Sequence, residues 1–353
     1  MTILLAAALA VQPFNQPGDA AIEAAMEAAY TPGLALVYLD GCRPQPPRVF
    51  GVADVETGAP VEAGTRFEAA SLSKPLFAWL FMEAVDAGLV DPDAPFAQTL
   101  ESPRIRFRAL YDRLTPRLAL SHQTGLPNWA GNAGDPDRMN RLSFLFEPGT
   151  AMSYSGEGYE LTQRYFEAST GAALDAAFRA AFSALMPGSA YSAPLPEGAP
   201  TAFGHNDEGR RNGGRPVTVH PHPNAAHSLV TTAPDYARFL ARACTGDGLS
   251  AEAHGEMLRP QVELRGDEWP GEPLDFGEAR LFWSMGWGVQ ELNGRRVHFH
   301  WGDNGQFKAF AAFDAQSGDG LVFLANGETA LQLIGPLAEP VLGELDAAIA
   351  FSD

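Results

Sequence analysis

Residues 67–88 read FEAASLSKPLFAWLFMEAVDAG and form the most informative stretch of the chain. The residues from Ser71 to Ala87 are strongly apolar and predict a buried helix, which Gly88 ends. A serine at a helix N-terminus lies where backbone N–H groups and the helix dipole stabilise a developing negative charge. Lys74, three residues further on, lies on the same face, so its amine can approach the Ser71 hydroxyl. If burial lowers its pKa, Lys74 can act as the base for a serine nucleophile.

Lysine is rare in this chain, which makes the Ser-x-x-Lys spacing informative. Of the 24 basic residues only Lys74 and Lys308 are lysines. A chance pair of this spacing is expected roughly 0.1 times in such a composition. Pro75 cannot donate a backbone hydrogen bond, so the first turn of the helix is expected to be irregular.

The composition restricts the classes of protein to which the chain can belong. It has 353 residues, is 46% hydrophobic and carries a formal charge of -19. This apolar content predicts a globular fold, and the acidic balance argues against nucleic acid or anionic lipid as a partner. After the N-terminal segment, no run approaches the ~20 apolar residues of a membrane span.

The N-terminal residues resemble a secretory leader. Residues 3–11 are apolar, and Ala8-Leu9-Ala10 is a small-x-small cleavage site, although no basic residue precedes Arg43. Residues 1–17 are therefore predicted to be a signal peptide, with a mature chain beginning near Val11 and a periplasmic or secreted location. The alternative is an ordinary N-terminal helix in a cytoplasmic protein.

The two cysteines, Cys42 and Cys244, lie far apart in the sequence and lack the spacing of a zinc or redox site. Two separate buried thiols are the favoured interpretation, and a disulfide is the alternative.

The pattern of elements predicts an α+β fold. Residues 18–353 are predicted to form one catalytic domain, whose α/β part covers about 18–90 and 228–353 and whose mainly helical insert covers about 91–227. Thr232 and Asp235 form a capping box that opens a helix. The predicted helices are 19–30, 71–87, 236–243 and 331–350; the predicted strands, which form an antiparallel sheet, are 34–40, 48–55, 284–291, 296–301, 308–313 and 320–325.

Two further segments carry side chains suited to chemistry. Residues 146–159 read FEPGTAMSYSGEGY and place Tyr154 between turn residues, where a phenol can relay a proton. Residues 300–305 read HWGDNG at the end of a predicted strand, where a glycine lets the backbone approach a ligand closely.

Together these three segments resemble the serine β-lactamase and penicillin-binding protein superfamily, in particular its class C and esterase-like branch. The order Ser-x-x-Lys, Tyr-x-Asn, Lys/His-x-Gly is repeated here at similar separations. Residues 120–129 (LSHQTGLPNW), 147–149 (EPG) and 232–235 (TAPD) match as well. The resemblance covers about residues 34–326 and implies a β-lactamase/DD-peptidase-like fold, with an antiparallel sheet flanked by helices.

The resemblance also implies roles for individual residues. Ser71 matches the acylated nucleophile, Lys74 its partner base and Tyr154 the tyrosine that passes a proton to the leaving group. The backbone N–H groups of Ser71 and Asp303 match the oxyanion hole, with Gly302 at the same strand edge. His300 stands where β-lactamases usually have lysine. No cofactor is implied.

Two positions depart from the family pattern and weaken the case for β-lactam hydrolysis. Gly156 replaces the asparagine whose side-chain amide holds a substrate carbonyl. Trp301 replaces the small hydroxyl residue that helps to bind a substrate carboxylate. An unperturbed His300 would also lose its charge above about pH 6.5, which predicts a pH-dependent affinity for anionic substrates.

The sequence thus predicts a serine hydrolase that forms an acyl-enzyme on a small ester, amide or peptide substrate, as an esterase or a D-amino-acid peptidase. The alternatives are a β-lactamase or DD-carboxypeptidase, and a non-catalytic protein that binds peptidoglycan or β-lactams. A metal-dependent hydrolase that uses His220, His222 and His227 is a more distant alternative, because Pro221 and Pro223 favour a loop and no cysteine or acidic cluster completes the set. His227 is otherwise predicted to line the pocket, and His122 to have a structural role.

Overall fold

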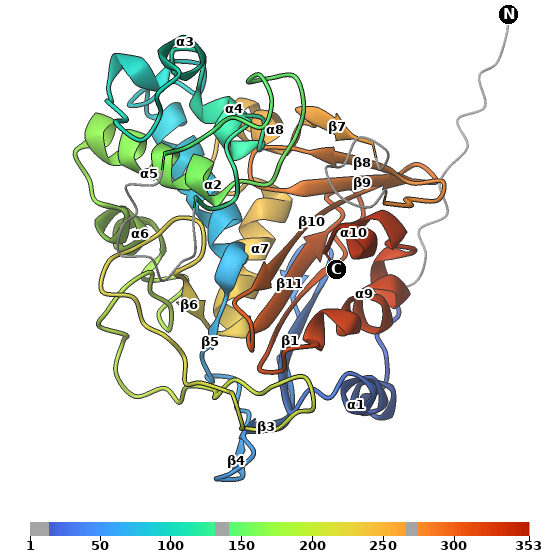
Figure 1. Ribbon diagram of the computed structural model, residues 1–353. Helices are drawn as coiled ribbons and strands as arrows, with labels where there is room; N and C mark the ends of the chain where they lie inside the picture. The colour runs from blue at the N-terminus through green and yellow to red at the C-terminus, as the bar shows by residue number, and fades with distance from the viewer. Residues whose placement is uncertain (1–13, 131–140, 266–273, 353) are drawn as a thin grey trace, which may run out of the picture.

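A large antiparallel sheet runs through the protein, as seen in a computed structural model that describes residues 14–130, 141–265 and 274–352 (Figure 1). Its strand order is β4-β3-β1-β12-β11-β10-β9-β8-β7, with β2 paired to β1, and a separate pair joins β5 to β6. The strands are β1 (Gly33–Asp40), β2 (Arg43–Pro44), β3 (Arg48–Asp54), β4 (Ala59–Pro60), β5 (Phe67–Glu68), β6 (Val230–Thr231), β7 (Val262–Leu264), β8 (Arg280–Trp283), β9 (Gly288–Leu292), β10 (Arg295–Asp303), β11 (Lys308–Phe313) and β12 (Gly320–Ala325).

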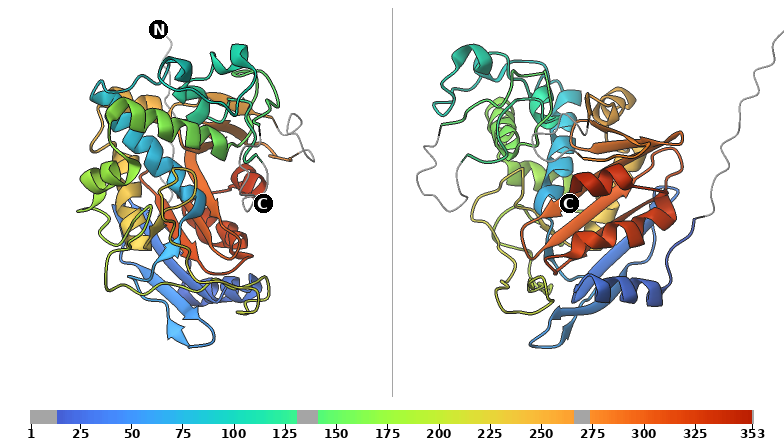
Figure 2. Two further views of the ribbon diagram at one scale, coloured as in Figure 1. Left: turned by 60° about the vertical axis from the view of Figure 1, so that its left-hand side comes forward. Right: turned by 45° about the vertical axis from the view of Figure 1, so that its right-hand side comes forward.

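Helices cover both faces of the sheet. One face packs against α1, α9 and α10, and the other against α2 and α7, behind which lies the mainly helical part that includes α5 and α6 (Figure 2). The helices are α1 (Asp19–Ala28), α2 (Ser73–Asp86), α3 (Arg108–Tyr111), α4 (Pro116–Leu120), α5 (Gly156–Thr170), α6 (Leu174–Phe182), α7 (Ala233–Thr245), α8 (Ala251–Leu258), α9 (Ile334–Leu342) and α10 (Asp346–Ser352), with 3-10 turns η1 (Ala70–Leu72), η2 (Phe96–Gln98) and η4 (Ala330–Leu333).

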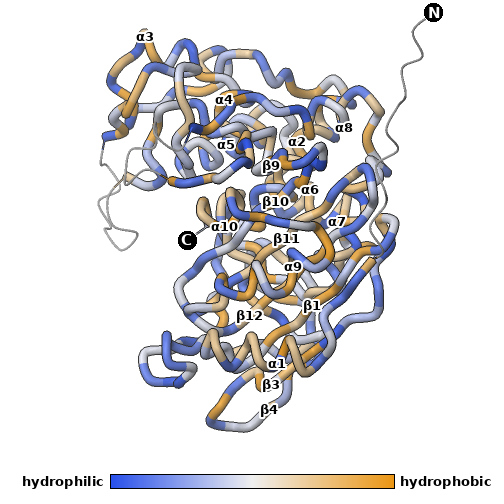
Figure 3. Tube along the Cα trace, turned by 90° about the vertical axis from the view of Figure 1, so that its right-hand side faces the viewer, coloured by the Kyte–Doolittle hydropathy of each residue, from blue (hydrophilic) through white to orange (hydrophobic). Residues whose placement is uncertain are grey.

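Strand β1 shows why the sheet needs cover on both faces. Leu34, Leu36 and Tyr38 belong to one hydrophobic cluster, whereas Val37 and Leu39 belong to the other. Successive side chains of a strand point to opposite faces, so an uninterrupted apolar strand is stable only between two layers. Hydrophobic stretches accordingly lie within the sheet and its covering helices, and hydrophilic ones in the outer loops (Figure 3).

The sequence predicted the fold class correctly, and most strand positions as well. Strands β11 and β12 have the predicted bounds. The strand predicted over residues 284–291 was wrong in its first half, because residues 284–287 form the turn between β8 and β9. Strands β7 and β8 were missed, since runs of three and four residues are too short to show an alternating pattern.

The favoured interpretation of the cysteines was wrong. Cys42 and Cys244 form a disulfide that joins the turn after β1 to the last turn of α7, across 202 residues of sequence. A disulfide favours an oxidising compartment such as the periplasm or the extracellular space.

The predicted N-terminal leader and the search for membrane-spanning helices concern different parts of the chain. Residues 1–13 of the predicted leader (1–17), which include its cleavage site, lie outside the described residues. Among the residues that are described, none of the helices has both the length and the apolar character needed to cross a bilayer.

Candidate active site

A cleft of about 650 Å³ contains Ser71 and Lys74. Its wall comes from several distant parts of the chain: the start of α2, the loop before residue 131, helix α5, the long loop at 215–227 and the end of β10. The lining residues are Glu68, Ser71, Lys74, Asn128, Trp129, Glu160, Arg215, Thr218, His220, Pro221, His222, Pro223, Asn224, His227, Asp303 and Asn304.

Ser71 is held at the start of α2 by an irregular first turn. It lies in the 3-10 turn η1, and the preceding Ala70 has a φ of 48°, in the left-handed region that non-glycine residues rarely adopt. The Ser73 hydroxyl donates to the Ala70 carbonyl at 2.6 Å and accepts from the Leu229 N–H at 3.0 Å. These bonds hold the backbone on both sides of Ser71. The first turn is irregular, as predicted.

The Lys74 amine points at Ser71 from a buried position. Its Nζ lies 3.0 Å from the Ser71 Oγ and donates to the Ala226 carbonyl at 2.7 Å. Burial lowers the pKa of Lys74 well below its usual value. Because the Ala226 carbonyl can only accept, one amine hydrogen is committed to it, and a neutral amine can turn its lone pair to the Ser71 hydroxyl.

Tyr154 lies next to this pair. The Lys74 Nζ is 4.7 Å from the centroid of the Tyr154 ring. Burial raises the pKa of Tyr154 above its usual value, and the nearby Ser71 hydroxyl offsets this only in part. The Tyr154 hydroxyl is buried and lies near the Ser71 hydroxyl without meeting the geometry of a hydrogen bond. Tyr154 is therefore a protonated phenol at neutral pH.

Two buried histidines flank Tyr154. The His122 Nδ1 accepts a hydrogen bond from the Ser155 N–H at 3.0 Å, and the His122 ring stacks on Tyr154 with centroids 4.3 Å apart. His300 has no exposed surface, and its ring lies 6.0 Å from that of Tyr154. Burial, with a smaller contribution from Lys74, lowers the pKa of His300 to about 3. The expected loss of charge near pH 6.5 is therefore wrong, since His300 is neutral throughout the physiological range.

The backbone at the end of β10 packs closely against the turn that holds Ser71. A Cβ at Gly302 would lie 2.3 Å from the Ala69 carbonyl oxygen, so only glycine fits against η1. Asp303 follows at the strand end and pairs with Lys308 at 2.6 Å. Trp301 does not line the cleft, because its indole packs between Tyr154, at 5.3 Å, and Phe351, at 5.2 Å.

Gly156 has a steric reason to be glycine. A Cβ at this position would lie 2.4 Å from the Trp129 indole, which covers it. The Gly156 N–H donates to the Asn128 Oδ1 at 2.9 Å, and the Glu157 N–H donates to the Asn128 carbonyl at 3.1 Å. The segment at residues 128–130 is thus fastened to the start of α5 by both backbone and side chain.

The rim of the cleft carries charged groups and histidines. Glu68 is buried and pairs with the Arg215 guanidinium. The rings of His220 and His227 lie 4.9 Å apart, and His227 lines the cleft as predicted. Residues 14–130, 141–265 and 274–352 contain no group of three His, Cys, Asp or Glu side chains arranged to hold a metal ion.

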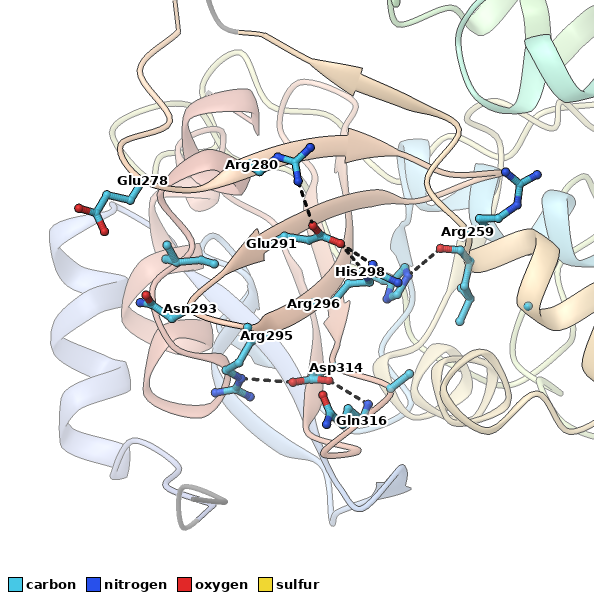
Figure 4. Close-up of a pocket in the computed structure, with 15 residues that line it drawn as sticks. Arg259, Glu278, Arg280, Glu291, Asn293, Arg295, Arg296, His298, Asp314 and Gln316 are labelled. Atoms are coloured by element: carbon cyan, nitrogen blue, oxygen red, sulfur yellow. Dashed lines mark hydrogen bonds and ion pairs between the residues drawn. The ribbon is translucent and has the colours of Figure 1, made fainter. Parts of the chain in front are cut away.

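A second hollow, of about 770 Å³, is lined by the end of α8, strands β8 to β10 and the turn after β11 (Figure 4). Its arginines are matched by acidic partners: Arg280 lies 3.8 Å from Glu291, and Arg295 donates to Asp314 at 3.2 Å. It offers no serine, lysine or tyrosine, whereas the smaller cleft holds the Ser71–Lys74 pair.

The structure places the predicted site residues in two groups. Ser71, Lys74 and Asp303 line the cleft, whereas Tyr154, Gly156, His300, Trp301 and Gly302 are not among its lining residues; Tyr154 nevertheless lies against the Lys74 amine. No role for Ala226 or Asn128 was predicted from the sequence. A backbone carbonyl such as that of Ala226 leaves no trace in the sequence, whereas Asn128 stands inside the quoted segment 120–129.

Comparisons with known proteins identify the fold and the family of the chain. The chain is 28% identical over 342 residues to penicillin-binding protein 4 of Amycolatopsis lactamdurans, covering 90% of this chain and 86% of the relative. The fold matches an octameric penicillin-binding protein homologue from Pyrococcus abyssi, with a TM-score of 0.75, 19% identity, and coverage of 92% and 78% of the two chains. It also matches the D-alanine carboxypeptidase AmpC from Burkholderia cenocepacia, with a TM-score of 0.72, 20% identity, and coverage of 92% and 97%. Because the beta-lactamase family model matches residues 19–334, nearly the whole chain, this protein belongs to the beta-lactamase family.

Proposed function

We propose that this protein is a serine hydrolase that forms an acyl-enzyme on Ser71 with small esters or amides. The observation that carries the proposal is the buried Lys74 amine, 3.0 Å from the Ser71 Oγ. A serine at a helix start, facing an amine whose pKa burial lowers, is an arrangement that can generate a nucleophile near neutral pH.

The environments of Lys74 and Tyr154 assign opposite roles to the two groups. Burial keeps Lys74 neutral and Tyr154 protonated, so Lys74 is the base and Tyr154 the acid. Lys74 removes the Ser71 proton as Oγ bonds to the substrate carbonyl carbon. The bond to the leaving group then breaks, and the leaving atom takes the Tyr154 proton. The Lys74 ammonium returns its proton to Tyr154, and water hydrolyses the acyl-enzyme.

The surroundings favour this proton cycle. The Tyr154 ring, 4.7 Å from the Lys74 Nζ, stabilises the transient ammonium through its π face. His122 and His300 are neutral because burial lowers both pKa values, so neither adds a positive charge beside the ammonium. The N–H groups of Ser71 and Asp303 are proposed to bind the oxyanion, which the close packing of Gly302 on Ala69 supports.

Ester or small-peptide hydrolysis is preferred to β-lactam hydrolysis. Trp301 and a neutral His300 provide neither the hydroxyl nor the cation that would hold a β-lactam carboxylate. The names of the relatives, a penicillin-binding protein and a D-alanine carboxypeptidase, support a peptidase as the second candidate. A non-catalytic binding protein would not require a neutral amine against Ser71.

The experiment compares turnover of p-nitrophenyl butyrate, a chromogenic cephalosporin and a D-alanyl-D-alanine peptide by the wild type and Ser71→Ala. We expect clear ester hydrolysis, slow cephalosporin hydrolysis, and loss of both in Ser71→Ala. Stoichiometric binding of the cephalosporin without turnover of any substrate would show a binding protein instead.

We also infer that the protein is exported. The Cys42–Cys244 disulfide supports an oxidising location, in agreement with the apolar start of the chain. The mass of the N-terminal peptide after expression in a Gram-negative host tests this: a start near Val11 supports export, and an intact Met1 in the cytoplasmic fraction contradicts it.

A further inference from the structure

His122 holds the backbone on both sides of Tyr154. Its carbonyl accepts a hydrogen bond from the Ser153 N–H at 2.9 Å, and its Nδ1 accepts one from the Ser155 N–H at 3.0 Å. Tyr154 stands between these two serines, and its ring packs on that of His122, with centroids 4.3 Å apart. One histidine thus contacts Tyr154 and both of its neighbours in the chain.

The backbone of His122 adopts a conformation that needs a compensating interaction. Its φ is 59°, in the left-handed region that few residues other than glycine adopt, and its side chain is fully buried. Such a conformation is energetically costly and persists where the surrounding contacts require it. In this conformation both the carbonyl and the ring of His122 reach residues 153–155.

The hydrogen bond to Ser155 determines where the His122 ring carries its proton. A backbone N–H can only donate, so Nδ1 presents a lone pair, and the proton of the neutral ring is on Nε2. Burial lowers the pKa of His122 well below its usual value, and Lys74 and His300 lower it further. The ring is therefore neutral at neutral pH and keeps its acceptor for Ser155.

Tyr154 depends on this support because its own hydroxyl is not anchored. The hydroxyl lies near that of Ser71 without meeting the geometry of a hydrogen bond to any described residue. Three other rings contact the Tyr154 ring at greater centroid distances than His122 does: Trp301 at 5.3 Å, Trp283 at 5.9 Å and His300 at 6.0 Å. The place of the hydroxyl beside Ser71 thus follows from the backbone that His122 holds.

We propose that His122 is a positioning residue for the acid Tyr154, which acts by accepting hydrogen bonds from the N–H groups of Ser153 and Ser155. His122 itself transfers no proton. A displacement of about 1 Å in a reacting group can cost on the order of 100-fold in rate, so a small shift of the 153–155 segment is enough to matter. The proposal rests on the proposed function, in which Tyr154 gives its proton to the leaving group.

The test uses two esters that share the butyryl group and differ in the basicity of the leaving group. p-Nitrophenolate leaves readily as an anion, whereas the more basic phenolate of phenyl butyrate depends on an acid. The quantity measured is kcat/KM for p-nitrophenyl butyrate divided by kcat/KM for phenyl butyrate. A misplaced Tyr154 raises this ratio, whereas a smaller amount of folded protein leaves it unchanged.

Two substitutions separate the acceptor of His122 from its ring. His122→Phe keeps an aromatic ring and removes the acceptor for the Ser155 N–H. His122→Asn removes the ring but can place Oδ1 where Nδ1 lies, and asparagine tolerates a left-handed φ. We expect His122→Phe to raise the ratio about 10- to 100-fold and His122→Asn to stay close to the wild-type ratio. If His122→Phe does not fold, His122→Gln replaces it, since its acceptor lies one bond further from the backbone.

A double-variant cycle and a matched control link the effect to Tyr154. In Tyr154→Phe the acid is already lost, so adding His122→Phe should not raise the ratio further. His298→Phe is the control, because His298 is also a buried histidine with a lowered pKa. Its Nε2 bonds to a backbone group, the Leu258 carbonyl, at 3.1 Å, but it lines the second hollow. We expect His298→Phe to keep the wild-type ratio.

The outcomes distinguish the two proposals. An unchanged ratio in His122→Phe, a further rise in the Tyr154→Phe background, or an equal rise in His298→Phe would overturn the positioning role and leave the hydrolase intact. A ratio that rises in His122→Asn but not in His122→Phe would also overturn it, because the ring and not the acceptor would then be required. If the wild type hydrolyses neither ester, the proposed function fails, and the role of His122 fails with it.

Discussion

The Lys74 amine lies between the Ser71 hydroxyl, at 3.0 Å, and the Ala226 carbonyl, at 2.7 Å. No acidic group contributes to the pKa of Lys74, which burial alone lowers. A cation in this position would be poorly solvated, so burial favours the neutral amine, which can deprotonate the hydroxyl that it faces.

Replacing Lys74 by methionine should lower the activity of the protein and raise its stability at pH 7. We expect Lys74→Met to lose about 10²- to 10⁴-fold in kcat, the usual range for a general base. The unfolded chain protonates Lys74 below about pH 10.4, whereas burial lowers the pKa of Lys74 in the folded chain, so protons favour unfolding between the lowered pKa and about pH 10.4. Wild-type stability should therefore rise with pH toward that value, and Lys74→Met should lack this dependence and melt higher at pH 7.

Melting curves and ester kinetics as a function of pH test both statements about Lys74. The wild-type kcat/KM should rise through the lowered pKa of Lys74 and level off well before pH 10.

The double variant Ser71→Ala/Lys74→Ala should be little worse than either single variant, because the two groups act as a unit. Additive losses would contradict the pairing.

Removing the Tyr154 hydroxyl should affect the rate and not the fold. The hydroxyl is buried and makes no hydrogen bond to a described residue, so Tyr154→Phe leaves no partner unsatisfied. We expect an unchanged melting temperature and a kcat lowered by about 10²- to 10⁴-fold, with the greatest loss for esters with poor leaving groups. Wild-type kcat across a series of leaving groups would show that Tyr154 has a packing role alone.

His300 should not titrate in the working range of the enzyme. Burial lowers the pKa of His300 to about 3, so the ring stays neutral from mildly acidic to alkaline pH. The ratio of KM for an anionic ester to KM for a neutral one should therefore stay constant between about pH 5.5 and 8. A transition near pH 6.5 that disappears in His300→Asn would show that His300 does carry charge there.

The Cys42–Cys244 disulfide should contribute substantially to stability. It closes a segment of 202 residues, which restricts the unfolded chain. We expect the double variant Cys42→Ser/Cys244→Ser to lose about 2–5 kcal/mol of unfolding free energy. Chemical denaturation with and without reductant checks this: reductant should lower the wild-type midpoint and leave that of the double variant unchanged.

The sequence predicted those parts of the fold and site that depend on local pattern. Ser71 and Lys74 are three residues apart, so helical spacing alone brings their side chains together. The neutral state of His300 was not predictable, since it depends on Trp301, Trp283 and Tyr154 closing around the ring. The hydrogen bond between Asn128 and Gly156 was not predictable for the same reason, since it joins residues 28 positions apart.

The central claim is that Ser71 becomes acylated. Intact-protein mass after treatment with a fluorophosphonate, followed by peptide mapping, measures this most directly in the wild type and Ser71→Ala. The account predicts one phosphonyl group per chain, located on Ser71, slower labelling in Lys74→Met, and no label in Ser71→Ala. Undiminished labelling of Ser71→Ala, or modification of a different residue in the wild type, would contradict it.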